Sequence, residues 1–406
     1  AAYEVPGKHP HPGVTQIVLQ HPELWAPAPN QLYCHDSDRP FATDANRFAL
    51  FCHAAAGLAL YTSIGDIDCI HLHDWPASLV LFLRQYHSAF AALKPIRTVL
   101  TIHNLAMQGI RPLRGDDSSL EAWFPGIPYD WFAVSDRRWP DCVNPMAAAI
   151  RAADAVHVVS PTYAEEILKP NRPPVFYGGE GVESDLAYAA GQDRLFGILN
   201  GCAYPEDRTV PRMERTEMMR VFRSSVVSWA GGGPVVSSAH FIAHARLEEM
   251  ADQAYNGKKM LLTAVSRVVE QKMLLLRAPG SNGWPGLQNL MDGMEGRHLF
   301  ILLGLGDYGY EQFFMQMSAR YPNFIFLNGY SARVAELLYA NGDLFIMPSS
   351  FEPCGISQML AMRDGQPCLV HRVGGLRDTV EHGVNGFSFE GASLTEQVDN
   401  MVAVAG

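Results

Sequence analysis

The chain lacks several features that would assign it to particular classes of protein. Its seven cysteines are an odd number and include no C-x-x-C pair, so neither a disulfide framework nor a zinc site is indicated. No apolar run reaches the ~18 to 20 residues that a membrane span needs. Lysine and arginine number 31 against 42 acidic residues, a net charge of −11, and the basic residues are scattered. That balance argues against a nucleic-acid surface and favours a neutral or small anionic substrate.

What the chain does contain is typical of a well-cored α/β protein. A hydrophobic share of 48% accompanies 18% charged residues, and 406 residues are enough for two domains. The chain begins at Ala1 without a methionine or a basic and apolar leader, so no targeting peptide is visible. The odd number of cysteines, with no C-x-x-C pair, leads us to expect a protein of the reducing cytoplasm.

Alternating strands and helices predict two Rossmann-like domains. A strand at residues 67–72, a helix at 76–91 and a strand at 96–102 form a βαβ unit. A second series follows an irregular stretch, and its strands lie near residues 261–265, 299–303, 324–327, 344–347 and 368–370. We place the boundary between domains 1–257 and 258–406. Tandem domains leave a cleft between them, which suits a transferase that holds a donor and an acceptor and excludes water.

The run from Phe345 to Val380 combines an acid, a glycine-rich turn and a helix start. A buried parallel strand is predicted before Glu352, which therefore lies on a strand-to-helix loop, where α/β proteins bind ligands. The next strand leads into Gly374 and Gly375, whose missing side chains let backbone N–H groups approach an anion. A carboxylate beside an anion site suits a sugar that carries a diphosphate.

Two strands of the first series end in polar residues. His71 and His73 share a strand face, and Asp74 follows at the carboxyl end, the usual place for function in a parallel sheet. The alternative is that both histidines are packed and that Asp74 caps the following helix. The next strand ends in His103 and Asn104, which are either functional residues or a satisfied loop pair.

Two cations follow the first strand of the second series. Arg267 and Lys272 lie five residues apart, close enough to converge on one diphosphate if the loop turns between them. The alternative is that both are solvated surface residues.

The run from Gly304 to Gly309 matches the G-x-G-x-x-G pattern of NAD-binding proteins, directly after a predicted strand. Such a site needs an acidic residue about twenty positions on, at the end of the next strand, to bind the ribose. That strand ends in Leu327, Asn328 and Gly329 instead, which disfavours the NAD-binding alternative.

Taken together, these segments resemble bacterial glycogen synthase and plant starch synthase, which are retaining glycosyltransferases. The matching phrases, between about Asn46 and Phe389, are HLHDWPASL, TIHNLAMQG, VHVVSPTYAEEI, GILNG, AVSRVVEQK, LLGLGD, YANGDLFIMPSSFEPCGISQ and VGGLRDTV. The resemblance implies an α/β fold of the GT-B type, in which two Rossmann-like domains face each other across a deep cleft. It implies transfer of glucose from ADP-glucose, with UDP-glucose as the second choice, to the non-reducing end of an α-1,4-glucan with retention of configuration.

The resemblance also implies roles for individual residues. Arg267 and Lys272 would hold the distal phosphate and stabilise the leaving nucleoside diphosphate, assisted by backbone N–H groups around Gly375 and Leu376. Glu352 would bind hydroxyls of the donor glucose and help to stabilise an oxocarbenium-like charge. No cofactor and no metal are implied.

On the other side of the predicted cleft, His103 would contact the sugar and Asp74 would lie near the acceptor. Tyr330 matches the family position that stacks on the base. The other implied positions are Gly306, Cys354, Gly355 and Gly374 for the donor and Trp75, Asn104 and Asn200 for the acceptor. No well-placed carboxylate nucleophile is evident, so a front-face mechanism is expected.

The chain departs from the family in three respects that bear on activity. Lys272 is followed by Met273 where the family phrase begins with Gly, and the chain ends at Gly406, before the family's last helix. The third departure is the opening loop. The family opens with a K-x-G-G-L loop that contacts the donor diphosphate, and no such phrase occurs here. The first domain is therefore expected to be without its first strand and loop. A catalytically impaired, glucan-binding or regulatory homologue of the same fold is the alternative function, and the sequence indicates no oligomeric state.

Overall fold

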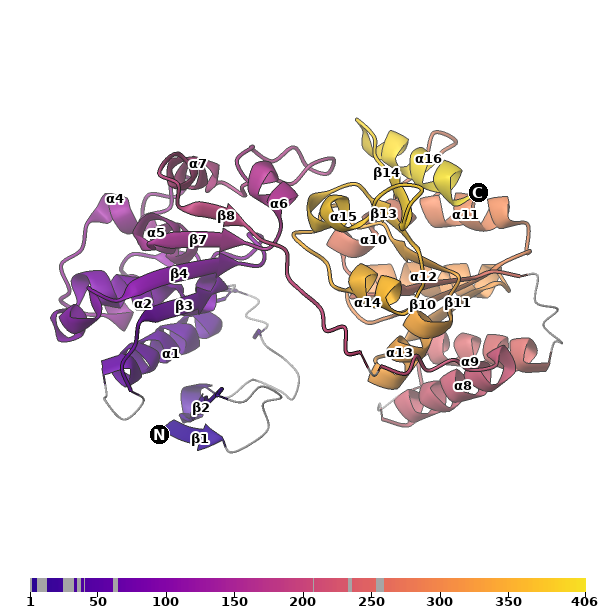
Figure 1. The fold of residues 1–406 in the computed structure, drawn as a ribbon, viewed down its shortest axis with the longest axis horizontal. Helices are drawn as coiled ribbons and strands as arrows, with labels where there is room; N and C mark the ends of the chain where they lie inside the picture. The colour runs from indigo at the N-terminus through magenta and orange to yellow at the C-terminus, as the bar shows by residue number, and fades with distance from the viewer. Residues whose placement is uncertain are drawn as a thin grey trace. The chain divides into compact units, whose positions relative to one another are not determined.

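The computed structural model describes residues 2–5, 13–24, 33–34, 38–39, 41–60, 65–206, 208–232, 236–252 and 259–406. The chain forms two compact units (Figure 1). Unit 1 comprises Ala1–Val159, Ile167–Asn171 and Gly178–Ile198, and unit 2 comprises Ser160–Glu166, Arg172–Tyr177 and Leu199–Gly406. None of the helices in the described part of the chain combines the length and the apolar composition that a membrane crossing requires.

The predicted domain boundary at 257/258 lies outside the described residues. Helices α8 (Arg215–Gly232) and α9 (Ser238–Asp252), which the prediction assigned to the first domain, belong to unit 2. The reason is packing: Phe222 of α8 and Leu247 of α9 are fully buried in the same hydrophobic cluster as Ile301 and Ile325 of the unit 2 sheet. Their amphipathic pattern gives no sign of which sheet they cover.

The described part of unit 2 is built on a sheet of six parallel strands. In chain order they are β9 (Leu261–Val265), β10 (Leu299–Gly304), β11 (Phe324–Asn328), β12 (Leu344–Met347), β13 (Cys368–His371) and β14 (Gly386–Phe389). Their spatial order is β11-β10-β9-β12-β13-β14, the strand order of the Rossmann fold. The order reverses between β9 and β12, and open α/β sheets bind ligands at such a switch point, outside the carboxyl ends of the strands.

Both faces of this sheet are covered by helices, because alternate residues of a strand point to opposite faces. Leu262, Phe300 and Phe324 pack with α10 (Glu270–Arg277), α11 (Gly286–Met294), α12 (Tyr308–Arg320) and α16 (Leu394–Ala405). Leu261, Leu299 and Ile325 pack with α8, α9 and α13 (Ala332–Asn341) on the opposite face. In Figure 1, α11 and α16 lie above β10 and β11, and α8 and α9 lie below them. The near-continuous apolar strands of the sequence are explained by this double burial.

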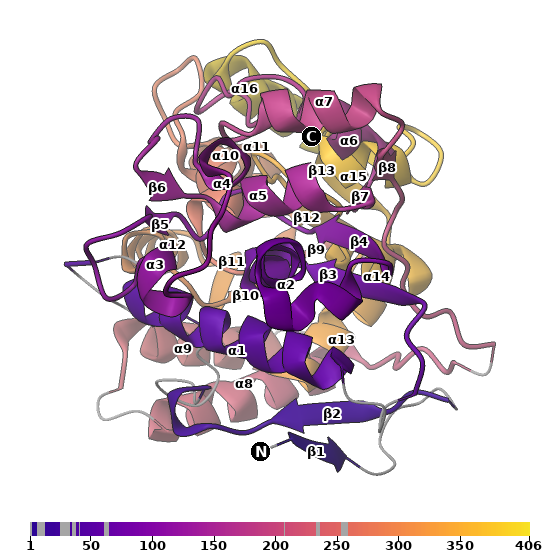
Figure 2. The ribbon, with the colours of Figure 1, turned by 90° about the vertical axis from the view of Figure 1, so that its left-hand side faces the viewer.

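The described part of unit 1 contains a sheet of four parallel strands in the order β3-β4-β7-β8. They are β3 (Cys69–His73), β4 (Arg97–Ile102), β7 (Ala155–Val158) and β8 (Leu195–Gly197). Helix α2 (Asp74–Tyr86) packs on β3 and β4, and α1 (Ala42–Leu60) packs on α2 (Figure 2). The predicted βαβ unit is confirmed. A separate antiparallel pair is formed by β1 (Ala2–Val5) and β2 (Gln16–Leu19).

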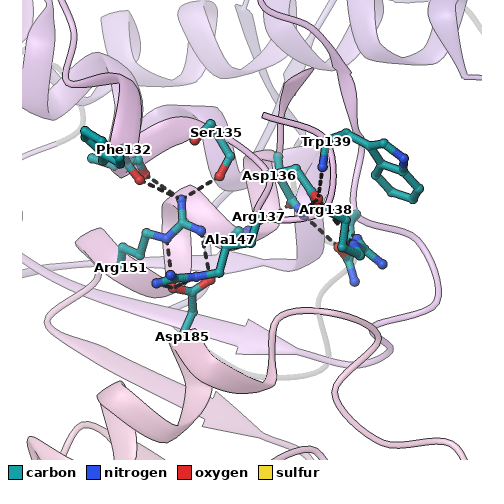
Figure 3. Close-up of polar contacts among 12 residues, drawn as sticks. Phe132, Ser135, Asp136, Arg137, Arg138, Trp139, Ala147, Arg151 and Asp185 are labelled. Carbon is teal, nitrogen blue, oxygen red and sulfur yellow. Dashed lines mark hydrogen bonds and ion pairs between the residues drawn. The ribbon is translucent and has the colours of Figure 1, made fainter. Parts of the chain in front are cut away.

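An aromatic segment between β5 (Arg111–Pro112) and β6 (Cys142–Val143) carries α3 (Leu120–Trp123) and α4 (Trp131–Val134). Arg151 of α5 (Pro145–Ala152) ties it to the unit, because its guanidinium donates to the carbonyl oxygens of Phe132, Ala133 and Ser135 at 3.2, 3.2 and 2.8 Å (Figure 3). Arg151 also pairs with Asp185 of α7 (Glu183–Gly191) at 2.8 Å. Burial acts to raise the pKa of Asp185, but hydrogen bonds from Arg151 and Arg137 outweigh it and lower that pKa.

Candidate active site

The first turn of α10, which follows β9, is hydrogen-bonded to the loop that follows β12 at the switch point of unit 2. The N–H and the hydroxyl of Ser350 donate to the carbonyl oxygen of Gln271 at 2.8 and 3.1 Å. The side-chain amide of Gln271 donates in return to the carbonyl oxygen of Phe351 at 3.1 Å. These bonds fix the spacing between side chains on the two segments.

Lys272 and Glu352 form an ion pair at this edge, between Nζ and Oε2. Their side chains are only 14% and 7% exposed, and the Ser349 hydroxyl donates to the same Oε2 at 3.0 Å. Among the described residues, none donates a hydrogen bond to the other carboxylate oxygen, Oε1. The position of Glu352 after a buried strand is as the sequence predicted, and its binding of sugar hydroxyls stays a prediction.

Arg267 has a different environment from Lys272. Its side chain is exposed, and it makes no ion pair or hydrogen bond with any residue that the structure describes. The structure therefore brings Lys272 to Glu352 and leaves the Arg267 guanidinium available, and convergence of the two cations on one diphosphate stays a prediction.

The glycines after β13 allow α15 (Gly374–Thr379) to press against the Glu352 loop. The N–H of Gly375 donates to the carbonyl oxygen of Glu352 at 3.0 Å. A Cβ atom on Gly374, whose φ is +44°, would collide with that carbonyl, and one on Gly375 would collide with Cys354. The glycines are required here because the two backbones approach closely.

The sequence predicted that backbone N–H groups of this turn approach an anionic ligand. In the structure, those of Gly374, Gly375 and Leu376 all have partners within the chain. Gly375 donates to Glu352, Leu376 donates to the carbonyl oxygen of Val373 at 3.0 Å, and Gly374 donates to the Glu166 carboxylate at 3.0 Å. Of these three N–H groups, only that of Gly374 bonds an anionic group, and this group is the Glu166 carboxylate. Contact of Gly375 and Leu376 with a phosphate stays a prediction.

The G-x-G pattern after β10 is explained by packing against the loop that carries Arg267. Val268 accepts the N–H of Asp307 at 2.7 Å, and Cβ atoms on Gly304 and Gly306 would collide with the carbonyl oxygens of Ser266 and Val268. The N–H of Gly306 donates to the Glu311 carboxylate at 2.8 Å. Close backbone packing explains why glycine is needed at these positions. The glycines therefore no longer support the NAD-binding alternative.

The buried side-chain amide of Gln358 bonds the backbone of Cys354 and Gly355. Gln358 Nε2 donates to the carbonyl oxygens of Cys354 and Gly355 at 3.2 and 3.1 Å, and Gly355 has a φ of +77°. Burial raises the pKa of the Cys354 thiol, and a hydrogen bond from the backbone of Asn200 opposes that shift. Asn200, predicted on the acceptor side, thus lies against the Cys354 loop within unit 2.

Sequence reasoning missed the residues that brace this loop from helix α6 (Pro161–Glu166). The Ser160 hydroxyl donates to the carbonyl oxygen of Pro353 at 2.5 Å, and Thr162 donates to the Asp378 carboxylate through both its N–H and its hydroxyl. The partners are about two hundred positions apart in sequence, so no local pattern signals the contacts. Tyr330, which follows β11, is 72% exposed, and its stacking on a base stays a prediction.

In unit 1, Asp74 does not cap α2 through its side chain, contrary to the alternative interpretation. The helix begins at Asp74 itself, whose φ is +56°, and its Oδ1 accepts the backbone N–H of His103 at 2.7 Å. Burial raises the pKa of Asp74, and the hydrogen bonds from the backbone of His103 and Asn104 oppose that shift. A left-handed conformation is costly for aspartate, and such strain is concentrated at functional sites.

The imidazoles of unit 1 form two hydrogen-bonded groups. Nδ1 of His73 lies 2.9 Å from Nε2 of His103. Thr101 Oγ1 lies 2.6 Å from Nε2 of His71 and 2.9 Å from Nδ1 of His157. The structure therefore brings Asp74 and His103 together at the carboxyl ends of β3 and β4, as the sequence predicted. Among the described residues, no group of three His, Cys, Asp or Glu side chains could hold a metal ion.

The prediction that Trp75 binds an acceptor is wrong for this structure, because its ring is 3% exposed. The indole packs edge-on against Phe48, with ring centroids 4.9 Å apart, and covers Gly109, where a Cβ atom would collide with it. Aromatic residues after a strand serve the core as readily as a ligand, and the local sequence does not separate the two. Asn104 is half-buried, and its side-chain oxygen accepts the N–H of Ala106 at 2.9 Å, which is a loop-forming contact.

Comparison with known protein families covers both units. Residues 3–188 match the starch synthase catalytic domain, and residues 240–405 match the glycosyl transferases group 1. Glycogen synthase from Streptococcus gordonii (strain Challis) is 37% identical over 343 residues, covering 83% of this chain and 64% of that protein. Glycogen synthase from Lactococcus lactis subsp. lactis (strain IL1403) is 32% identical over 391 residues, covering 90% and 71%. The chain thus spans 64% of the length of the S. gordonii relative.

Among solved structures, the catalytic domain of starch synthase IV from Arabidopsis thaliana, bound to ADP and acarbose, resembles this chain with a TM-score of 0.68. The alignment covers 96% of this chain and 74% of that one at 24% identity. This likeness bears on the fold, and it confirms the predicted GT-B type.

Proposed function

The chain belongs to the family of bacterial glycogen synthases and starch synthases, and we propose that it transfers glucose from a nucleotide sugar to an α-1,4-glucan. The observation that carries this proposal is the buried pair of Lys272 and Glu352, held by bonded segments at the switch point of unit 2. A cation for a leaving diphosphate and a carboxylate for sugar hydroxyls are the two groups that such a transfer requires.

The geometry suggests how the charges act. An ammonium has three N–H donors, so Lys272 can keep its bond to Glu352 while another N–H donates to the distal phosphate. Arg267, which is exposed, adds a second cation that stabilises the departing nucleoside diphosphate. Glu352 Oε1 accepts a hydroxyl of the donor glucose, and its charge favours an oxocarbenium-like transition state. Departure and attack occur on the same face of the sugar, so configuration is retained.

The donor in this proposal is ADP-glucose in preference to UDP-glucose. Support comes from the starch synthase IV structure, which contains ADP. Tyr330 stacks on the base, and His103 of unit 1 contacts the donor glucose. No cofactor and no metal take part, and the proposed location is the cytoplasm.

Incorporation of radiolabelled glucose into glycogen tests the proposal, with ADP-glucose and UDP-glucose assayed in parallel. Glu352→Gln removes the charge with little change in shape and is expected to lower kcat by about a hundredfold or more. Glu249→Gln is the matched control, because Glu249 forms an exposed ion pair with Arg246 on the surface of the same unit. Glycan binding by the unaltered protein without turnover of either donor would instead identify an impaired, glucan-binding homologue.

A further inference from the structure

Two consecutive residues at the end of β3 hold the backbone and the ring of His103 separately. The Asp74 carboxylate accepts the His103 N–H at 2.7 Å, and Nδ1 of His73 lies 2.9 Å from His103 Nε2. The rings of His73 and His103 are stacked, with centroids 5.2 Å apart and planes inclined by 23°. A half-buried loop histidine is thus fixed at two points.

The contact between the two imidazoles couples their proton states. A neutral imidazole has one donor nitrogen and one acceptor nitrogen, so one ring donates and the other accepts. If His73 Nδ1 donates, His103 Nε2 accepts and the proton of His103 lies on Nδ1; if the direction is reversed, Nδ1 of His103 is the acceptor. In either case Nε2 of His103 is engaged in the bond between the two rings, and Nδ1 of His103 is the nitrogen available to a ligand.

We propose that His73 is a positioning residue for His103, which it holds in one orientation with Nε2 engaged and Nδ1 available to the ligand. This inference rests on the proposed function, in which His103 contacts the donor glucose. Hydrogen-bonded partners set the ring orientation of histidines that bind metals, and their removal there typically costs about 10- to 100-fold in affinity or activity, which we take as the scale of the effect here. His73 itself touches no reacting atom in this scheme.

The surroundings favour a neutral His73. The titratable groups around it are His71 on β3, His103 after β4, His157 on β7 and Asp74 at the start of α2. Burial lowers the pKa of His73, and the neighbouring imidazoles of His71, His103 and His157 lower it further. The bond between the rings is therefore kept as the pH falls, since two protonated rings could not share it.

The neighbouring histidine group supplies a matched control. His157 Nε2 lies 3.1 Å from the carbonyl oxygen of Ile198, which can only accept, so His157 carries its proton on Nε2. Its Nδ1 then accepts from the Thr101 hydroxyl, which accepts in turn from His71. No hydrogen bond among the described residues links this group to the ring of His103.

The experiment compares the whole chain with its His73→Ala, His73→Asn and His157→Ala variants, using ADP-glucose and glycogen as probes. His73→Ala is expected to lower kcat by about 10- to 100-fold with a smaller change in KM. His73→Asn, whose amide can bond near the position of Nδ1, is expected to recover most of the loss. His157→Ala is expected to leave kcat within about twofold of the unaltered protein, because it does not bond His103.

A second readout is independent of activity. The ring ¹⁵N shifts of His103, assigned with a His103→Asn variant, are expected to report a hydrogen-bonded Nε2 in the unaltered protein and to change in His73→Ala, where Nε2 loses that partner. Unchanged shifts and unchanged kcat in His73→Ala would overturn the inference. If the unaltered protein transfers no glucose, the proposed function fails, whereas the shifts still decide whether His73 bonds Nε2 of His103.

Discussion

The two sheet edges that carry the candidate residues are held in different ways. At the edge of unit 2, the ion pair of Lys272 and Glu352 lies between segments that bond each other through their backbones. At the edge of unit 1, the corresponding contacts run from the strained Asp74 and the neutral imidazole of His73 to the single loop residue His103. The first edge is stabilised by opposite charges in a buried place, and the second by hydrogen bonds that need correct proton positions.

This difference between the two sheet edges predicts how each one responds to a substitution. A buried charge that loses its partner is strongly destabilised, so the unit 2 edge depends on charge compensation. A hydrogen bond between neutral rings is worth less, but it is directional, so the unit 1 edge depends on orientation. The charged edge suits an anionic leaving group, and the imidazole edge suits sugar hydroxyls.

The largest expected effect comes from breaking the charge compensation. Lys272→Met leaves Glu352 buried without its cation and is expected to lower the free energy of unfolding by about 3–5 kcal/mol and to abolish measurable transfer. Adding Glu352→Gln is expected to restore most of the stability but none of the activity. Urea denaturation of the single and double variants measures the coupling, and equal stabilities would show that the pair does not compensate.

Trp75→Ala tests whether the unit 1 edge contains a core residue where the sequence suggested a binding residue. Removing a buried tryptophan is expected to cost about 3–5 kcal/mol of unfolding free energy. At a temperature where the variant is folded, the KM for glycogen should change little, because the ring is not accessible. Normal stability with a large rise in that KM would restore the acceptor-binding role.

Asp74→Asn tests the buried carboxylate through the pH dependence of stability. Because burial raises the pKa of Asp74 in the folded state, its stabilising contribution is present below the unfolded pKa and is lost as the pH rises through the folded pKa. The asparagine variant keeps an acceptor for His103 without the charge. Its stability relative to the unaltered protein is therefore expected to increase as the pH rises from 3 to 7. A difference that stays constant across that range would contradict the cause given for the shift.

The smallest effect is expected for Tyr330. Its side chain is exposed, and it belongs neither to the Lys272–Glu352 pair nor to the contacts that hold His103. Tyr330→Ala should raise the KM for ADP-glucose by about 2- to 10-fold, the size of an aromatic stacking contact, and leave the unfolding free energy within about 0.5 kcal/mol. Tyr330→Phe is the matched control and should keep the original KM, since it retains the ring.

Much of the fold could be predicted from the sequence because strands buried on both faces of a sheet are continuous apolar runs, which are easy to recognise. Strands such as β10 and β12 are continuous apolar runs, and each is followed by the polar residues of a ligand-binding edge. Glu352, Lys272, Asp74 and His103 could be placed by this rule alone, because the carboxyl ends of parallel strands share one edge. The roles of Trp75 and of the Gly375 and Leu376 N–H groups could not be predicted from the sequence. Side-chain packing decides the first, and backbone hydrogen bonds decide the others.

By itself, the sequence determined the α/β class, the order of the strands along the chain and the family, because these depend on local periodicity and on short motifs. Only the tertiary structure decided that α8 and α9 join unit 2, that Lys272 pairs with Glu352, and that His73 bonds the ring of His103. His73 and His103 are 30 positions apart in the sequence, and Lys272 and Glu352 are 80 apart. Such pairs are set by how strands and helices stack, and no local pattern records that stacking.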